Sequence, residues 1–147
     1  MLKLAKIIHS NGFHITFINS KNKHKHLLNS RGPLSLDGLH DFQYKIIPDG
    51  LPSSWFDDTQ DILSLCYSTM TTCLPFFCQL LIDLMDPHAN SSFASVTCII
   101  AYGVMSFTLD ANVELGIPEF LFRATSAYDF MCYLYYHHLI AKFLAPL

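Results

Sequence analysis

Charge is scarce in this chain. Of its 147 residues, 14% are Asp, Glu, Lys or Arg, whereas 51% are hydrophobic. Soluble domains average about 25% charged residues. The surface left after a core has formed therefore carries too few charges for a free-standing monomer. We expect part of that surface to associate with other protein through an exposed apolar face.

An excess of positive charge is also absent. Nine basic and twelve acidic residues give a formal net charge of −3. A nucleic-acid-binding domain carries a basic face, so nucleic acid is excluded as a partner. The one basic cluster is interpreted as a solvated face, with an anion contact as the alternative. It consists of Lys21, Lys23, Lys25 and Arg31.

Paired-cysteine motifs are missing. The chain has five cysteines, an odd number, and no C-x-x-C pair. This pattern predicts reduced thiols in a cytoplasmic protein. The alternative is a zinc site that uses His137 and His138. Because adjacent residues of a helix point about 100° apart, they suit a shared metal poorly, and no metal is expected.

Targeting signals and uninterrupted apolar runs are lacking as well. Lys3 and Lys6 interrupt the start of the chain, which therefore has no apolar core of a signal peptide. The stretch Pro87–Leu109 has no charged residue, but Pro, Asn, Ser and Gly break it. We expect no membrane span.

The apolar residues that are present predict strands alternating with helices. A helix ends at Asn11-Gly12, a short polar helix covers Asn22–Asn29, and a helix begins at Thr59 and runs toward Cys73. A second helix begins at Pro75, and a last one covers Ser126–Phe143. The expected strands are Phe13–Asn19, Phe42–Ile47, Val96–Ala101 and Glu119–Phe122. Such alternation predicts an α/β fold with a parallel, Rossmann-like sheet and flanking helices.

The segment Val96–Asp110 is the most informative part of the chain. It combines a buried strand, a turn at Gly103 and a helix. In open α/β sheets, ligands bind in the crevice at the carboxyl ends of such strands. The candidate functional site is therefore placed directly after the strand that ends at Ala101.

Several segments together resemble the amino-terminal half of plant UDP-glycosyltransferases. They are MLKLAKIIHSNGFHITFIN at the start, IIPDGLP at 46–52, GVMSFTLDANVELGIPEFLF at 103–122 and ATSA at 124–127. The resemblance extends over nearly the whole chain, and the most similar subgroup acts on cyanohydrins and iridoid aglycones. It implies a GT-B architecture, in which an acceptor-binding half is followed by a half that binds UDP-glucose. Residues 1–147 would then be a partial acceptor-binding domain without a donor-binding domain.

The resemblance also implies a mechanism. In the family, a His after the first strand is the general base on the acceptor hydroxyl of a small metabolite, and an Asp orients that His. This arrangement is reasonable because a hydroxyl is a poor nucleophile near neutral pH and needs a positioned base. By the alignment of motifs, the first strand and the His would precede Met1, and Tyr102 occupies the Asp position. No catalytic residue is therefore assigned, and UDP-glucose is not expected to bind to this chain.

The acceptor-pocket or sugar-side positions implied by the resemblance lie after two strands. Arg123 stands where the family usually has Trp, and Ala124 where it has Thr. The positions are Tyr102, Gly103, Arg123, Ala124 and Thr125.

Other interpretations of single residues are weaker. A catalytic Tyr102 is disfavoured because a phenol cannot replace a carboxylate as a charge partner. His14 is expected to be a half-buried structural residue of a strand rather than a base. Arg123 is interpreted as reaching solvent at a strand end, with a phosphate contact as the alternative. Ser126 is interpreted as a helix cap rather than a nucleophile.

Three hypotheses for the whole chain follow. The first is a member of the glycosyltransferase family that is itself catalytically silent. The second is a non-catalytic binding or interaction module. The third is a product of a mis-assigned gene or pseudogene with no function of its own.

Overall fold

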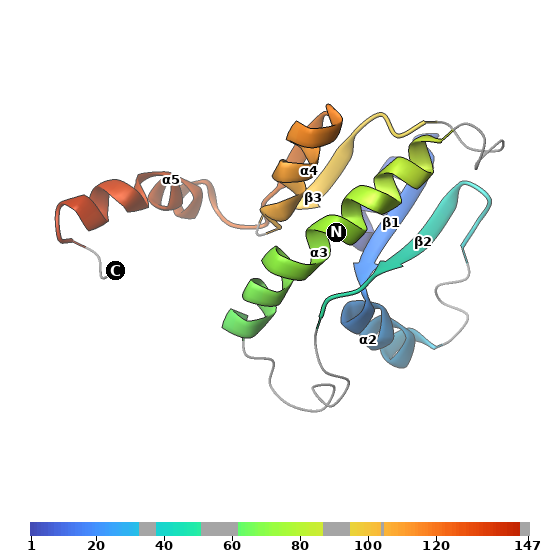
Figure 1. The fold of residues 1–147 in the computed structure, drawn as a ribbon, viewed down its shortest axis with the longest axis horizontal. Coiled ribbons are helices and arrows are strands. Elements are labelled where there is room, and N and C mark those ends of the chain that lie inside the picture. Colours follow the sequence, from blue (N-terminus) through green and yellow to red (C-terminus); the bar gives the residue numbers. More distant parts are fainter. Residues whose placement is uncertain (33–37, 51–61, 87–94, 104, 145–147) are drawn as a thin grey trace.

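The structure is a computed structural model, and it describes residues 1–32, 38–50, 62–86, 95–103 and 105–144. Helices and strands alternate along it (Figure 1). The helices are α1 (Leu2–Ser10), α2 (Lys21–Arg31), α3 (Ile62–Met85), α4 (Phe107–Leu115) and α5 (Ala127–Ala141). The strands are β1 (Ile15–Ser20), β2 (Phe42–Ile47), β3 (Ile99–Tyr102) and β4 (Glu119–Phe122).

The strands are parallel, as expected, but they form two separate pairs. β1 pairs with β2 from Ile15↔Phe42 to Ser20↔Ile47, and β3 pairs with β4 from Ile99↔Glu119 to Tyr102↔Phe122. No ladder joins β1 to β3 in the described part of the chain. The expected single sheet is therefore divided into two two-stranded sheets.

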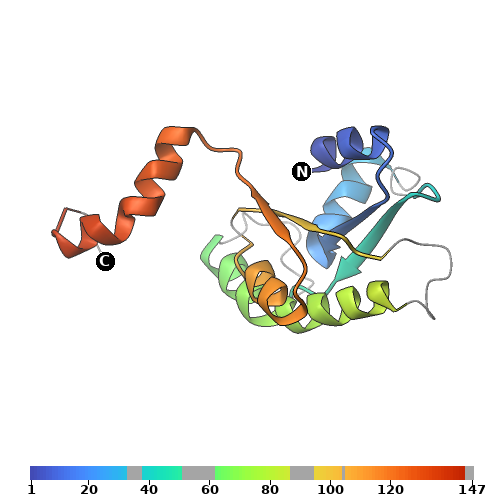
Figure 2. The same ribbon diagram turned by 90° about the horizontal axis from the view of Figure 1, so that it is seen from above.

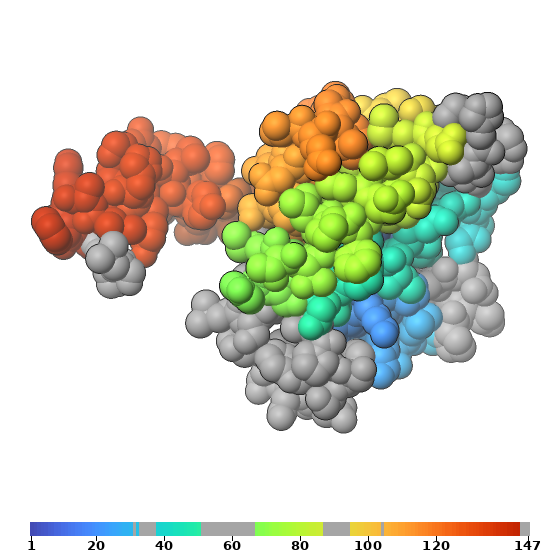
Figure 3. All heavy atoms as spheres, in the orientation of Figure 1, coloured from blue at the N-terminus to red at the C-terminus, as the bar shows by residue number. Residues whose placement is uncertain are grey.

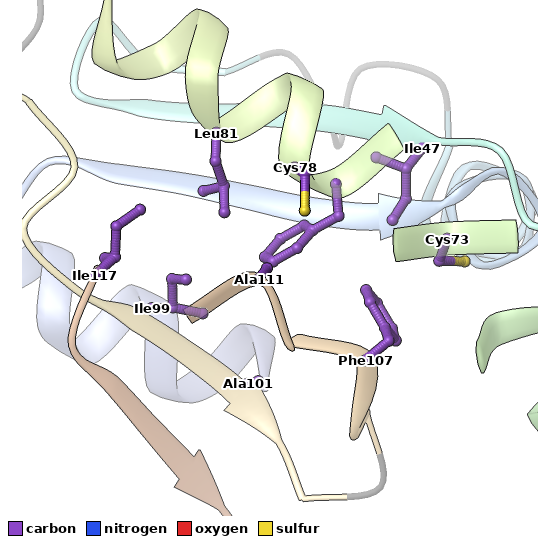
Figure 4. Close-up of a cluster of buried hydrophobic side chains, with 10 residues drawn as sticks. Ile47, Cys73, Cys78, Leu81, Ile99, Ala101, Phe107, Ala111 and Ile117 are labelled. Carbon is purple, nitrogen blue, oxygen red and sulfur yellow. The ribbon is translucent and has the colours of Figure 1, made fainter. Parts of the chain in front are cut away.

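One helix, α3, packs against residues of both strand pairs. The buried cluster contains Ile47 at the end of β2 as well as Ile99 and Ala101 of β3 (Figure 4). α3 contributes four residues to the cluster, which lie on one side of the helix because they follow each other at intervals of four, one and three positions. They are Cys73, Phe77, Cys78 and Leu81. Phe107 and Ala111 of α4 and Ile117 complete the cluster, and the Phe77 and Phe107 rings meet edge to face at 5.6 Å.

The prediction of two helices in this region was wrong. α3 is one continuous helix of 24 residues with Pro75 inside it. Proline has no N–H, so Pro75 cannot donate to the carbonyl of Thr71, and an interior proline costs about 3 kcal/mol. Burial of Phe77 and Leu81 contributes about 1.5–3 kcal/mol per side chain. The free energy gained by burying these side chains therefore offsets the cost of Pro75, and the helix continues through it. Thr59 and Cys66 lie outside the residues whose side chains are described.

The same helix contains a segment, Tyr67–Met85, that is long and apolar enough to cross a membrane. The expectation of no membrane span rested on the stretch 87–109, and this candidate segment lies before it. Length and composition do not separate a membrane span from a core helix, and four side chains of this segment lie in the core. Other apolar side chains of the segment, among them Met70, Phe76 and Ile82, are exposed, so packing against β2, β3 and α4 accounts for one side of the helix.

A buried aspartate connects the end of β2 to α2. Ser20 caps α2 by accepting from Lys23 N at 3.4 Å, and Asp49 Oδ2 accepts from Asn22 N at 2.8 Å. Both Asn22 and Asp49 are buried. Carboxylates near a helix amino terminus are favourable because the first N–H groups have no partner within the helix. This contact fixes the loop after β2 over the start of α2.

Burial of Cys73 makes stability depend on pH in the alkaline range. Its Sγ donates to the Pro48 carbonyl at 3.5 Å, and burial, followed by the charge of Asp49, raises the pKa of this thiol to about 11. In the unfolded chain the thiol ionises near its ordinary pKa of 9.0. Between these values the unfolded state loses a proton that the folded state keeps, so stability falls as pH rises.

We therefore expect urea titrations to give a free energy of unfolding that decreases from about pH 9 to pH 11. The Cys73→Ala variant is less stable throughout because it leaves a cavity, but its alkaline decrease is smaller. An identical alkaline decrease in the variant and the parent would contradict the assignment to Cys73.

Candidate functional site

The carboxyl ends of β3 and β4 lie side by side. Tyr102 and Phe122 are partners in the parallel register, and Gly103 N donates to the Phe122 carbonyl at 2.9 Å. The chain then turns from Gly103 toward α4, and from Arg123 toward α5. Residues that are 20 positions apart in the sequence therefore meet at one edge of the sheet.

A small hollow lies at this edge. Its lining consists of Tyr102, Gly103, Arg123, Ala124 and Thr125, the five positions that the resemblance indicated. The hollow measures about 30 Å³, which is room for one or two water molecules and not for a metabolite. The structure thus brings the five residues together at one edge of the sheet.

Arg123 covers Gly103 and contacts α5. Its Nη2 donates to the Gly103 carbonyl at 3.3 Å, and its guanidinium carbon lies 4.2 Å from the ring centre of Tyr133 and 5.1 Å from that of Phe130. Such cation–π contacts contribute about 0.5–1 kcal/mol each at exposed sites. The interpretation of Arg123 as reaching solvent was therefore incomplete, since the side chain is half-buried between the β3–α4 turn and α5.

Gly103 is required by this close approach. A Cβ atom built at Gly103 would lie 2.5 Å from Cγ of Arg123. Any larger residue would displace the arginine from its place over the turn. The small residue at 103 and the long one at 123 therefore fit each other.

No side chain that lines the hollow can act as a general base near neutral pH. None of the five is a carboxylate or an imidazole, the groups that most often act as general bases in enzymes. Among the described residues, no carboxylate forms an ion pair with Arg123. The edge therefore presents a positive charge and a phenol hydroxyl, which can donate hydrogen bonds but cannot accept the proton of an acceptor hydroxyl.

The described histidines lie away from this edge or are unsuited to it. His9 of α1 contacts Asp41 at 3.0 Å, just before β2 and thus at the opposite, amino-terminal edge of its strand pair. The hydrogen bond from His9 lowers the pKa of the Asp41 carboxyl. His14 precedes β1 and is exposed, so the prediction of a half-buried strand residue was wrong. It is exposed because β1 begins one residue later.

The rings of His137 and His138 lie against each other at a tilt of 41°. Their ring centres are 3.9 Å apart on α5. Within the described ranges, no group of three or more potential ligands is placed to hold a metal ion.

Ser126 is a helix cap, as predicted. Its Oγ accepts from Asp129 N at 3.2 Å, and Asp129 Oδ2 accepts from Ser126 N at 3.3 Å. This reciprocal capping box satisfies two N–H groups at the start of α5. The contacts of Phe130 and Tyr133 with Arg123 were not predicted. Their i, i+3 spacing at the start of a helix that closely follows Arg123 was the available signal.

Comparison with known proteins identifies relatives of the chain. No family model matches the chain. It is 58% identical over all 147 residues to a 7-deoxyloganetin glucosyltransferase of Gardenia jasminoides, covering 30% of that protein. It is 50% identical over its full length to a UDP-glycosyltransferase of Arabidopsis thaliana, again covering 30%. It is 47% identical over 146 residues, 99% of its length, to the (R)-mandelonitrile beta-glucosyltransferase of Prunus dulcis, of which it covers 30%.

Over its whole length the chain is thus homologous to plant UDP-glycosyltransferases, as the motifs predicted. It spans about 30% of the length of these relatives.

The contacts of Arg123 generate a prediction. The Arg123→Ala variant loses one hydrogen bond and two cation–π contacts, so the start of α5 should open more easily, by about 1–2 kcal/mol. Hydrogen exchange of the α5 amides measures this opening. The Arg123→Lys variant keeps the charge but not the planar guanidinium. Its exchange rates should lie between those of the parent chain and of Arg123→Ala. Unchanged exchange in Arg123→Ala would show that the contacts do not hold α5.

Proposed function

We propose that the chain contributes the acceptor side of a UDP-glycosyltransferase that transfers glucose from UDP-glucose to a hydroxyl of a small plant metabolite. The observation that supports this most directly is the hollow at the carboxyl ends of β3 and β4. Its lining consists of the positions assigned to the acceptor and sugar side by resemblance. This is also the edge of a parallel sheet where ligands bind in open α/β folds.

The acceptor class is suggested by the relatives. Two of them are named for glucosylation of 7-deoxyloganetin and mandelonitrile, which are small organic molecules. Tyr102 Oη and the free donors of Arg123 would orient the oxygen atoms of such an acceptor. Ala124 and Thr125 would contact its edge.

We further propose that this chain alone is catalytically silent. An acceptor hydroxyl attacks the anomeric carbon of the sugar only when a base removes its proton, and none of the residues that line the hollow can do so. In the GT-B arrangement, the base and the donor-binding domain would come from parts of a full-length protein that correspond to other segments of the relatives. The division between β1 and β3 fits a further parallel strand between them in such a protein. We also propose a cytoplasmic location, because the sequence has an odd number of cysteines and no C-x-x-C pair.

The direct test is an assay of the purified 147-residue chain. With UDP-glucose and mandelonitrile, we expect no glucoside by chromatography and no saturable UDP binding by calorimetry. The mandelonitrile glucosyltransferase of Prunus dulcis is the positive control under the same conditions. Measurable glucoside formation or micromolar UDP binding by the chain would overturn the proposal of silence.

A chimera tests the acceptor role and the effect of Tyr102 together. In it, residues 1–147 replace the homologous segment of the Prunus dulcis enzyme, with the rest of that enzyme retained. The Tyr102→Asp chimera should exceed the unmodified chimera in kcat/KM by about 10²-fold or more, because a carboxylate that orients a basic imidazole is worth as much as about 10⁴-fold in catalytic triads. Circular dichroism confirms that both chimeras fold. Equal activity of the two would show that a carboxylate at 102 is dispensable.

A further inference from the structure

Arg123 carries a positive charge that no described residue neutralises. Within the described part of the chain, its guanidinium takes part in no ion pair. It donates one hydrogen bond there, from Nη2 to the Gly103 carbonyl at 3.3 Å. A guanidinium has five N–H donors and keeps its charge in proteins. Most of the donors of Arg123, and the whole of its charge, therefore remain for a ligand.

The carboxylates nearest to Arg123 in the sequence are engaged elsewhere. Glu119 stands at the opposite end of β4, where its Oε1 accepts from Thr108 Oγ1 at 2.5 Å. Asp129 accepts from Ser126 N and Oγ in the capping box of α5. Neither forms an ion pair with the guanidinium. The described part of the chain thus leaves a positive charge without a counter-charge at the hollow.

The guanidinium of Arg123 is held in place by the helix that follows it. Its carbon lies 4.2 Å from the ring centre of Tyr133 and 5.1 Å from that of Phe130, where β4 leads into α5 (Figure 2). These contacts and the bond to Gly103 already restrict the rotamers of the side chain. A charged group that is fixed before a ligand arrives binds it with a smaller loss of entropy.

The surroundings of Arg123 also favour a negative charge. Tyr102 supplies a phenol hydroxyl that can donate a hydrogen bond. α4 begins close by, because Met105 N donates to the Tyr102 carbonyl at 2.8 Å, and its amino terminus has no side-chain cap. A helix amino terminus carries a partial positive charge. Asp110 in the first turn of α4 offsets part of this effect, but no carboxylate lines the hollow itself.

The size of the hollow suits one carboxylate group. Its volume of about 30 Å³ holds one or two water molecules, and the two oxygen atoms of a carboxylate would take their places. The rest of the ligand would lie outside, past Ala124 and Thr125, which are exposed. In the face shown in Figure 3, α5 forms a lobe beside the other elements, with which it makes no extended contact in the described residues. A ligand can therefore extend outward from the hollow.

We propose that the acceptor of this chain is a small hydroxy acid, whose carboxylate binds the guanidinium of Arg123 while its hydroxyl is the group that receives glucose. The proposal rests on the proposed function and narrows its substrate class. A planar guanidinium matches a carboxylate through two parallel hydrogen bonds. A phosphate monoester carries up to two negative charges, whereas Arg123 is the single cation that lines the hollow. A carboxylate is therefore the better match in charge.

Binding to the 147-residue chain tests this class without any catalysis. The probes are mandelate, a hydroxy acid, and mandelamide, its uncharged amide of nearly the same shape. In ¹H–¹⁵N NMR titrations, mandelate should shift the Arg123 Nε–H and Gly103 amide signals and bind with a Kd about tenfold or more below that of mandelamide. The preference is expected because a charge-assisted hydrogen bond is about twice as strong as a neutral one.

Three variants separate a direct contact from a structural role of Arg123. In Arg123→Gln the ratio of the two Kd values should fall to about one, and in Arg123→Lys it should be intermediate because the planar fork is lost. Lys45→Gln removes an exposed cation of β2 outside the hollow and should keep the parent ratio. Loosening of α5 would weaken both ligands alike, so it would leave the ratio unchanged. The dispersion of the amide signals shows that each variant is folded.

A parent chain without a preference for mandelate would overturn the proposal, as would an unchanged ratio in Arg123→Gln. Inorganic phosphate that binds more tightly than mandelate would assign the hollow to a phosphate group instead. Calorimetry on the chimera with the Prunus dulcis enzyme should also show the preference for mandelate. Equal affinities there would mean that another part of the enzyme neutralises Arg123, and would overturn the proposal. A chimera that prefers mandelate but forms no glucoside, even as Tyr102→Asp, would contradict the proposed function alone.

Discussion

The packing of α3 against both strand pairs is the contact on which the rest of the structure depends. No ladder joins β1 to β3 in the described residues, so backbone hydrogen bonds do not hold the two pairs together. The shared element is the buried side of α3, in which Cys73 lies near the end of β2 and Leu81 lies in the cluster with β3 and α4. The position of the β3–β4 edge relative to the first strand pair therefore depends on apolar side chains. A break in α3 at Pro75 would separate the two strand pairs. Packing of the buried side of α3 against both pairs therefore favours a continuous helix in spite of the interior proline.

At the β3–β4 edge, by contrast, backbone geometry does most of the positioning. The parallel register brings residue 103 next to residue 123 whatever their side chains are, and the hydrogen bond from Gly103 N to the Phe122 carbonyl fixes this approach. Side chains then decide what the edge can do. Arg123 fills the space over Gly103 and connects it to α5, so the residue that gives the edge its charge also directs the helix that leaves it.

The sequence predicted the local elements better than their assembly. β4 was predicted with its correct bounds, and β2 likewise, because turn residues flank short runs of apolar and aromatic residues. The five positions that line the hollow were indicated by the family resemblance, and they meet because the ends of parallel strands lie at one edge of a sheet. The continuity of α3 was missed because the rule for proline is local, whereas the burial of Phe77 and Leu81 is a tertiary effect. Two features were not predicted: the division of the sheet into two pairs, and the contacts of Arg123 with Gly103 and α5. Both depend on which elements meet in space.

The backbone geometry of the β3–β4 edge is independent of the side chain at position 102. The strand, its register and the turn at Gly103 are held by backbone hydrogen bonds, so a phenol or a carboxylate at 102 would leave them intact. The chemistry of the edge, in contrast, depends on that side chain, because a carboxylate can hold a negative charge next to an imidazole and a neutral phenol does not. The arrangement of the backbone at this edge therefore does not decide whether proton transfer can take place there. Homology therefore supports the architecture of this edge more strongly than its activity, which has to be argued from the residues that line it.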